Sequence, residues 1–532
     1  MQRHCLMLLL LATFAGVASN VVANDSAAVF QYVLPVATKK GEKMAFLWIP
    51  PQAEAVRGVV VGGMTLMERE LAKDPQIRQA CADEKLAIVF LKCGLGAVDV
   101  PGVLDQFAKK SGYAELAQAP ILFVGHSAGG PQARLSARQH AERCIALVQY
   151  RGADPGDVDH DGEHGIPPGI PALMMIGQFD EFGKIGRDEN DIENWEKDRD
   201  KLIKFRQQNP RNLGCILVEP GGGHFAWSNR NAKYLALYIR KAAAARIAGP
   251  DEPLKKVSPA SGWLSDASLK SPRQLEPAPY DKYQGTRQDA LWHFDEQLAR
   301  ATIEYHQGLT KQDQFISWKD RHRVVARARY FFTEVDWSGD GQTFEVHPVY
   351  ADTYPTIGAR WGKSGEPVGH ADAPILVKHV SGPIEHVGDH RFRILHDALA
   401  PATEPTRATW MAFSHGDDQY RYTERVGMFN AGDLTVDEGR EQTLTFSELS
   451  DRKANAGPEK LLASSDAGLP VSFHVGFGPA RIEGGQLLIT EVPKRAKLPI
   501  SIQVVAYQSG RGVKPHVQTA APIVRTFQLL SP

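Results

Sequence analysis

Short apolar runs alternate with helical stretches between residues 28 and 248, and this alternation restricts the fold more than any other feature of the sequence. A strand that is apolar at successive positions has both faces buried, so it belongs in a parallel sheet with helices on both sides. We therefore expect an α/β fold with a mostly parallel sheet over this region. The expected strands are residues 29–36, 44–49, 57–61, 86–91, 120–124, 145–148, 172–176 and 215–218, and the expected helices are residues 66–83, 103–110, 131–143 and 231–247.

The pattern changes beyond residue 248. Residues 249–280 are rich in proline, which predicts a linker or an irregular segment that wraps the first domain. Residues 281–435 predict a mixed accessory domain, with a helix over residues 289–306 followed by short strands. Residues 436–532 alternate with period two between Gly/Pro turns, which predicts a C-terminal β-sandwich. We expect the accessory domain to pack on the first domain, the C-terminal region to lie further out, and neither to contribute chemistry.

The N-terminus has the features of a secretory signal peptide. Arg3 and His4 precede the apolar run of residues 5–17, and residues 21–23 (Val-Val-Ala) fit a cleavage site before Asn24. We therefore expect residues 1–23 to be removed and the protein to be secreted or periplasmic. No other run approaches the roughly 20 apolar residues of a membrane span, so none is expected.

Composition excludes some classes of protein. A content of 43% hydrophobic and 23% charged residues in 532 is ordinary for globular proteins, which excludes a disordered or fibrous chain. The formal net charge of −1 gives no basic surface for nucleic acid. The cysteines left after signal removal do not form Cys-x-x-Cys pairs, and most lie in or beside apolar strands, so we expect free thiols. These are Cys81, Cys93, Cys144 and Cys215.

The sequence Gly-His-Ser-Ala-Gly-Gly at residues 125–130 follows a buried strand and precedes a helix. This is the G-x-S-x-G nucleophile elbow, in which a sharp turn needs Gly125 and Gly129 and presents the Ser127 hydroxyl at the carboxyl end of the sheet. The five-residue pattern alone is weak evidence for a nucleophile elbow. The strand before it and the helix after it make the evidence specific. Ser127 is therefore the expected nucleophile.

A serine hydroxyl needs a base, and in this architecture the partners follow in the order Ser, acid, His. His224 lies in a Gly-rich loop directly after the strand of residues 215–218, which favours it over the other histidines of the region. Asp180 follows the strand of residues 172–176 and is the expected acid that orients His224. Glu181 is the alternative acid. The competing histidines are His140, on an expected helix, and His160 and His164, in a polar insertion.

The negative charge that develops on a substrate carbonyl needs two N–H donors. One is expected from Ala128, the residue after the nucleophile. The other is expected from the turn after the strand of residues 57–61, where we favour the Met64 N–H over that of its neighbour Gly63.

These residues, in this order and on these elements, resemble the α/β-hydrolase superfamily over roughly 40% of the chain, and residues 111–120 and 223–228 resemble exported bacterial hydrolases. The resemblance implies ester hydrolysis through an acyl-enzyme, without a cofactor, on a small ester or an esterified polysaccharide. The alternatives are a serine peptidase or amidase on the same core, and a non-catalytic binding protein. Residues 468–527 resemble bacterial immunoglobulin-like modules. Acyl and alcohol specificity and the oligomeric state stay open.

Three further patterns in the sequence have some features of a metal site. We expect that none of the three binds a metal. Residues 157–162 and 336–341 begin like calcium loops, but the twelfth positions are Pro168 and His347 instead of Glu. A polar loop and a tight turn between strands are the expected structures. The third pattern is a group of histidines, of which His386 and His390 could share a metal only on a helix, and the local Gly and Pro content opposes a helix there. Its members are His370, His379, His386, His390 and His396.

Overall fold

The computed structural model describes residues 29–64, 66–152, 154–157, 165–180, 194–250, 252–269, 275–320, 323–325, 334–354 and 365–532. The expected signal peptide, Glu181, and most of the calcium-like pattern at residues 157–162 lie outside these ranges. Among the residues described, no helix combines the length and the apolar character that crossing a membrane requires.

Eight strands of the first domain form one sheet in the order β1-β2-β4-β3-β5-β6-β7-β8. Strands β3 to β8 are parallel, and β2 runs antiparallel to both β1 and β4. This is the α/β-hydrolase arrangement, and it confirms the expected fold. The strands are β1 Tyr32–Thr38, β2 Gly41–Trp48, β3 Gly58–Gly63, β4 Leu86–Leu91, β5 Ile121–His126, β6 Cys144–Tyr150, β7 Pro171–Gly177 and β8 Leu213–Glu219.

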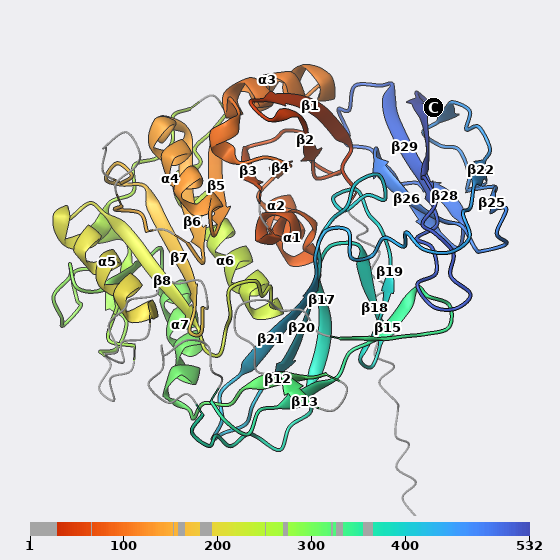
Figure 1. The fold of residues 1–532 in the computed structure, drawn as a ribbon. Helices are drawn as coiled ribbons and strands as arrows, with labels where there is room; N and C mark the ends of the chain where they lie inside the picture. Colours follow the sequence, from red (N-terminus) through yellow and green to blue (C-terminus); the bar gives the residue numbers. More distant parts are fainter. Residues whose placement is uncertain are drawn as a thin grey trace, which may run out of the picture.

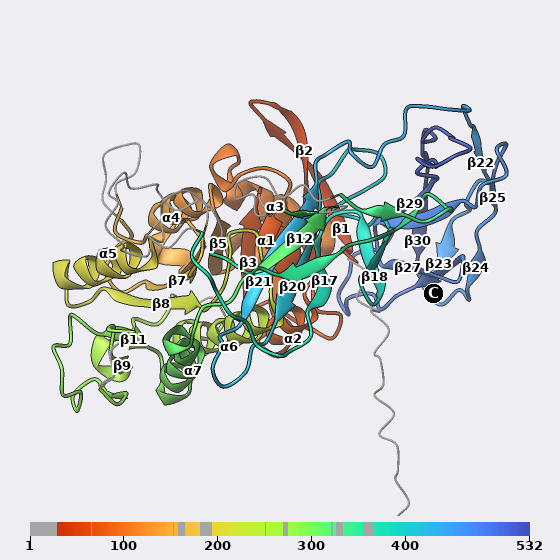
Figure 2. The ribbon, with the colours of Figure 1, turned by 60° about the horizontal axis from the view of Figure 1, so that its bottom comes forward.

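Helices cover both faces of this sheet, as the fully buried parallel strands require. Figure 2 shows α4 and α5 on one side of the sheet and α2 and α6 on the other. The helices are α1 Leu66–Lys73, α2 Pro75–Asp83, α3 Val100–Ser111, α4 Gly129–Gln139, α5 Asn194–Gln208 and α6 Asn229–Arg246.

The helix expected over residues 66–83 is two helices, because Pro75 cannot continue the first one. Asp74 caps the second helix, since its side chain accepts hydrogen bonds from the Gln76 and Ile77 N–H groups. Proline at the first position of α2 needs no N–H partner there. The chain therefore turns between α1 and α2 while keeping both helices on the sheet.

The proline-rich segment and the residues after it cover the β8 edge of the sheet. Leu264 and Trp292 pack in one apolar cluster with Leu213 of β8. The elements are β9 Trp263–Ser265, β10 Ala278–Pro279, β11 Leu291–His293 and α7 Glu296–His306. The helix expected from residue 289 thus begins only at Glu296, where Asp295 caps it, and residues 291–293 pair with β9 as a strand. The His306 Nε2 atom accepts the Val218 N–H of edge strand β8 at 3.0 Å.

The accessory region beyond α7 consists of short antiparallel strands in three sheets, β13-β12-β16, β14-β15-β19-β18 and β17-β20-β21. In Figure 1 the sheet of β17, β20 and β21 lies at the bottom of the view, below α1 and α2 of the α/β domain. The strands are β12 Ile316–Asp320, β13 Arg323–Val325, β14 Asp336–Trp337, β15 Thr343–Glu345, β16 Pro348–Tyr350, β17 Leu376–Ser381, β18 Ile384–Gly388, β19 Arg391–Ile394, β20 Ala408–Ser414 and β21 Thr423–Phe429.

The C-terminal region consists of small sheets, β23-β30-β29-β26, β24-β28-β27 and β22-β25, and its long strands match the alternating segments of the sequence. Its strands are β22 Leu444–Phe446, β23 Arg452–Lys453, β24 Glu459–Lys460, β25 Ala463–Ser465, β26 Ser472–Phe477, β27 Ala480–Glu483, β28 Gln486–Ile489, β29 Ile500–Tyr507 and β30 Ile523–Leu530.

This region does not lie further out, and that expectation was wrong. The Gly478 N–H donates to the Phe30 carbonyl at 2.8 Å, and the Lys497 N–H donates to the Ser111 carbonyl at 2.9 Å. The Arg495 guanidinium reaches Glu115 at 3.0 Å. Figure 1 accordingly shows the blue strands beside β1 and β2. The region docks on the edge of the sheet opposite to β8.

The four cysteines are free in the structure, three of them buried and Cys93 half-buried. Burial raises the pKa of the Cys81, Cys144 and Cys215 thiols to about 12 and also raises that of Cys93. Since the thiolate is the reactive form, we expect none of the three buried thiols to react with iodoacetamide at neutral pH before the protein unfolds. Mass spectrometry of the treated native protein checks this, and alkylation of any of the three would contradict it. Without reductant it should also find no stoichiometric disulfide among the four cysteines.

Candidate active site

Ser127 stands on the sharp turn between β5 and α4 with a φ of 52°, in the left-handed region that side chains rarely adopt. The turn brings Gly125 so close to Gly129 that a Cβ on Gly125 would lie 2.2 Å from the Gly129 carbonyl oxygen. The Ser127 N–H donates to the Tyr150 carbonyl at 2.9 Å, which fixes the turn to the end of β6. The Ser127 side chain is therefore held in one place at the carboxyl end of the sheet, partly open to solvent.

The structure brings Ser127, His224 and Asp180 together in one hydrogen-bonded chain. The Ser127 Oγ and His224 Nε2 atoms are 2.8 Å apart, and His224 Nδ1 lies 2.9 Å from both carboxylate oxygens of Asp180. His224 is only 3% exposed and Asp180 only 7%. A hydroxyl within hydrogen-bond reach of an imidazole that a third group orients is the arrangement found in nucleophilic catalysis.

The loops that carry Asp180 and His224 are tied to each other. The Phe179 N–H donates to the Gly222 carbonyl at 2.8 Å, and the Gly221 N–H donates to the Gln178 Oε1 atom at 2.9 Å. These bonds bridge the end of β7 and the end of β8, which are neighbours in the sheet. The Asp180–His224 distance is thus set by the sheet and by two bonds between the loops.

His126, the residue before the nucleophile, supports His224 from below. Its Nε2 lies 3.1 Å from the His224 carbonyl oxygen, and the two rings are 5.1 Å apart. Burial, with the neighbouring His224, lowers the pKa of His126 well below its ordinary value, so its ring is neutral. Because a carbonyl can only accept, the proton of this neutral ring stands on Nε2. This role of His126 was not expected from the sequence.

Glu68 is a second residue that the sequence analysis missed. It lies in the first turn of α1, where an acidic residue suggests an exposed helix end, yet it is 1% exposed. Its Oε1 atom accepts the His126 N–H at 2.7 Å, and a Cβ on Gly129 would approach the same oxygen to 2.6 Å. Glu68 therefore fixes the strand end that leads into the Ser127 turn, and it explains why Gly129 has no side chain.

The two expected oxyanion donors differ in their surroundings. Ala128 is exposed beside Ser127 at the N-terminus of α4, where N–H groups point out of the helix. The Met64 N–H donates to the Leu91 carbonyl at 3.1 Å, so it is occupied rather than free. It could hold an oxyanion only after leaving Leu91. Gly63, the alternative, lies inside the sheet at the end of β3.

A buried ionic network lies behind the His224 loop. The carboxylate of Glu219, at the end of β8, pairs with Arg151 and accepts hydrogen bonds from Ser228 at 2.8 Å and from Asn231 at 2.7 Å. Burial would raise the Glu219 pKa, but the guanidinium groups of Arg151 and Arg230 outweigh it and the pKa is lowered. Glu219 is therefore ionised beneath the loop.

The five histidines that lie close together in the sequence each place a ring nitrogen 2.8–3.2 Å from a backbone carbonyl oxygen. Within the described ranges no three His, Cys, Asp or Glu side chains gather as a metal site would require. The pattern at residues 336–341 is a tight turn, in which Asp340 accepts the Gln342 and Thr343 N–H groups. The histidines are His370, His379, His386, His390 and His396.

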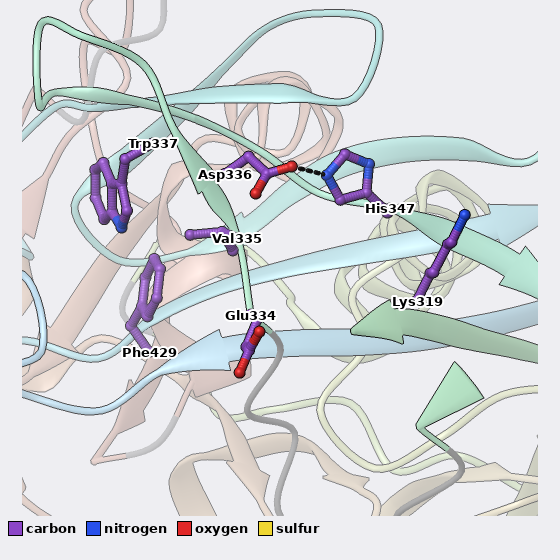
Figure 3. A pocket seen from close by; sticks show the side chains of 7 residues that line it. All are labelled: Lys319, Glu334, Val335, Asp336, Trp337, His347 and Phe429. Carbon is purple, nitrogen blue, oxygen red and sulfur yellow. Dashed lines mark hydrogen bonds and ion pairs between the residues drawn. The ribbon is translucent and has the colours of Figure 1, made fainter. Parts of the chain in front are cut away.

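A hollow of about 490 Å³ lies in the accessory region, and no triad residue lines it. Figure 3 shows Asp336 and His347 pointing toward each other within it, with Trp337 and Phe429 side by side at one end. The Asp336 carboxylate and His347 Nε2 are 2.8 Å apart. Because its lining residues include none of Ser127, Asp180 and His224, we treat this hollow as separate from the candidate active site.

The fold and the Ser127 turn define the α/β-hydrolase class of structure. No protein-family model matches the chain, and neither does any curated protein. Among solved structures, an esterase from Pyrobaculum calidifontis is 13% identical, with 42% of this chain and 89% of that chain covered and a TM-score of 0.29. An S-formylglutathione hydrolase from Agrobacterium tumefaciens is 15% identical, with 40% and 94% covered and a TM-score of 0.27. Structural similarity at these TM-scores does not indicate the activity of this protein.

Proposed function

We propose that this protein is an exported serine hydrolase that cleaves carboxylic esters through an acyl-enzyme. The observation that carries the proposal is the chain of two hydrogen bonds from Ser127 through His224 to Asp180, at 2.8 and 2.9 Å. The partial exposure of Ser127 supports it, because a substrate carbonyl must reach the hydroxyl oxygen.

In the first half of the proposed reaction, Ser127 Oγ attacks the ester carbonyl carbon while its proton passes to His224 Nε2. Asp180 holds Nδ1–H and stabilises the imidazolium that forms. The Ala128 N–H donates to the developing oxyanion, with Met64 as the proposed second donor once it leaves the Leu91 carbonyl. The C–O bond to the alcohol then breaks, and His224 gives its proton to the leaving oxygen.

In the second half, water attacks the acyl carbonyl and gives a proton to His224. The bond between Ser127 Oγ and the acyl carbon breaks, the carboxylic acid leaves, and the proton returns to Ser127. These steps use only the named side chains and water. A serine peptidase or amidase would use the same groups on a nitrogen leaving group, which makes it the second candidate.

A fluorophosphonate probe tests the serine-hydrolase proposal. Purified protein should incorporate one probe per chain at Ser127, and p-nitrophenyl acetate should protect it. A protein that stays folded but takes no label would be a binding protein on this fold, and the proposal would fail. A panel of acetyl, feruloyl, glucuronoyl-methyl and p-nitrophenyl esters, run beside matched amides, separates the esterase from the amidase and tests the proposed action on esterified polysaccharide.

Export is a separate part of the proposal and has its own test. Expression of the full chain in a bacterium, followed by N-terminal sequencing of the protein outside the cytoplasm, should yield a chain that begins at Asn24. Retention of Met1 on the folded, active protein in the cytoplasm would contradict export.

A further inference from the structure

The three residues before His224 are Gly221, Gly222 and Gly223, so apart from its backbone hydrogen bonds this stretch of the loop has no side chains to hold it in place. Glycine gives such a loop more conformational freedom than any other residue. The start of strand β21 lies directly against it: a Cβ on Gly221 would lie 1.9 Å from the carbonyl oxygen of Tyr422, the residue before β21, and 2.9 Å from the Thr423 Cα. The loop is therefore confined by a part of the chain some two hundred residues away.

One side chain of this strand bonds the loop next to the base. The Gly223 N–H donates to the Glu424 Oε1 atom at 2.9 Å, across a separation of 201 residues. Glu424 is only 8% exposed, so water does not compete strongly for this bond. The bond joins the residue adjacent to His224 to a strand of the accessory sheet.

The Glu424 carboxyl group is itself held from its other side. The Tyr422 hydroxyl donates to Glu424 Oε2 at 2.8 Å, and the Arg151 guanidinium lies 3.9 Å from Glu424 Oε1. Arg230 stacks over the Tyr422 ring, with its Cζ 3.9 Å from the ring centroid. Glu424 is thus a fixed acceptor, whereas a carboxyl group on a loose side chain could not define a position.

We propose that Glu424 is a positioning residue of the active site, whose carboxyl group holds the Gly223 N–H and thereby keeps the His224 imidazole between Ser127 and Asp180. This inference rests on the proposed function for its effect on rate, but not for its effect on the position of His224. It gives the accessory region a part in holding the active site together, although no residue beyond 250 is proposed to take part in the chemistry itself.

The environment of Glu424 indicates which property of the side chain matters. Burial, followed by the negative charge of Glu219, raises the Glu424 pKa to about 8 despite Arg151 nearby. The other groups that face it are Tyr422 and, more distantly, Tyr150, Arg230 and Lys378. The raised pKa favours the uncharged carboxyl group, so we infer that its acceptor oxygen matters more than its charge. Glutamine keeps such an oxygen and alanine does not.

The test compares Glu424→Ala, Glu424→Gln and Glu345→Ala, where Glu345 is an exposed residue of β15 in the same region. With p-nitrophenyl acetate, Glu424→Ala should lower kcat by roughly 10- to 100-fold with KM within about twofold, because a misplaced base affects the chemical step. Glu424→Gln should restore kcat to within about threefold, and Glu345→Ala should change nothing. An unchanged kcat in Glu424→Ala, or equal losses in both Glu424 variants, would overturn the proposal.

A second readout does not depend on activity. The proton shared by His224 and Asp180 should give a downfield NMR resonance in the wild type, which Glu424→Ala weakens and Glu424→Gln keeps. If the wild type cleaves no ester yet shows this behaviour, the proposed function fails and the positioning role stands. Should Glu424→Ala not fold, Tyr422→Phe removes only the hydroxyl that holds Glu424; it should lower kcat several-fold, and an unchanged kcat would contradict the proposal.

The raised Glu424 pKa also predicts a pH dependence of stability. Between its ordinary value of 4.5 and about 8, the unfolded chain loses a proton that the folded protein retains, so the folded state loses stability as pH rises through this range. Glu424→Gln cannot lose that proton. Denaturant unfolding should show that the free energy of unfolding of the wild type falls below that of Glu424→Gln as pH rises. Below a pH of about 4.5 the difference between the two proteins should not change with pH. If the unfolding free energies of the two proteins change with pH in parallel from 4.5 to 8, the raised pKa of Glu424 is contradicted.

Discussion

Replacing Ser127 by alanine should lower kcat on p-nitrophenyl acetate by roughly 10⁵- to 10⁶-fold, because no other group can take over covalent attack. His224→Ala should cost about as much, since the three side chains act as one unit and the loss of either ends the same step. Stopped assays on purified protein measure the residual rate, and circular dichroism checks that the fold is kept.

Ser268→Ala is the matched control for this experiment, because Ser268 is exposed and lies in the segment that covers the β8 edge. It should leave kcat unchanged. A Ser127→Ala protein that keeps its fold and more than a few per cent of its activity would show that the hydrolysis has another nucleophile, and the proposed acyl-enzyme would be wrong.

Asp180→Asn should lower kcat by roughly 10⁴-fold while changing the geometry little. The His224 Nδ1 atom lies 2.9 Å from both carboxylate oxygens, so an amide there can present an N–H to Nδ1 and hold the proton on Nε2 instead. In that tautomer His224 cannot accept the Ser127 proton. The rate as a function of pH, measured on purified variants, tests this.

Glu181→Gln is the control for the acid, because Glu181 is the neighbouring carboxylate that the sequence allows in the same role. It should keep kcat within about threefold. If Glu181→Gln proves damaging and Asp180→Asn silent, the acid is Glu181 and the Asp180 assignment is wrong.

Much of the α/β domain could be predicted from local patterns. Each parallel strand is a continuous apolar run because both of its faces are buried, and such a run is visible without knowing its neighbours. The same holds for the turn at Ser127, since its two glycines and the flanking strand and helix are contiguous. His224 and Asp180 followed from the rule that functional side chains extend from the carboxyl ends of such strands.

Other features were not predictable because they depend on contacts between distant segments. The helix expected over residues 66–83 divides at Pro75, and the strand of residues 291–293 exists because β9 pairs with it, which local helical periodicity cannot reveal. The C-terminal region docks on the sheet edge through backbone bonds such as Gly478 to Phe30. A period-two strand pattern predicts a sheet but does not say what the sheet packs against.

The sequence by itself determined the α/β sheet, the Ser127 turn and the order of the expected triad, because each of these depends on the chemistry of contiguous residues. Only the tertiary structure decided that the Met64 N–H is bonded to Leu91, that Glu68 and His126 are buried beneath the turn, and that Glu424 reaches Gly223. The physical reason is that a buried hydrogen bond depends on which donor and acceptor meet away from water. That meeting is set by the packing of the whole chain.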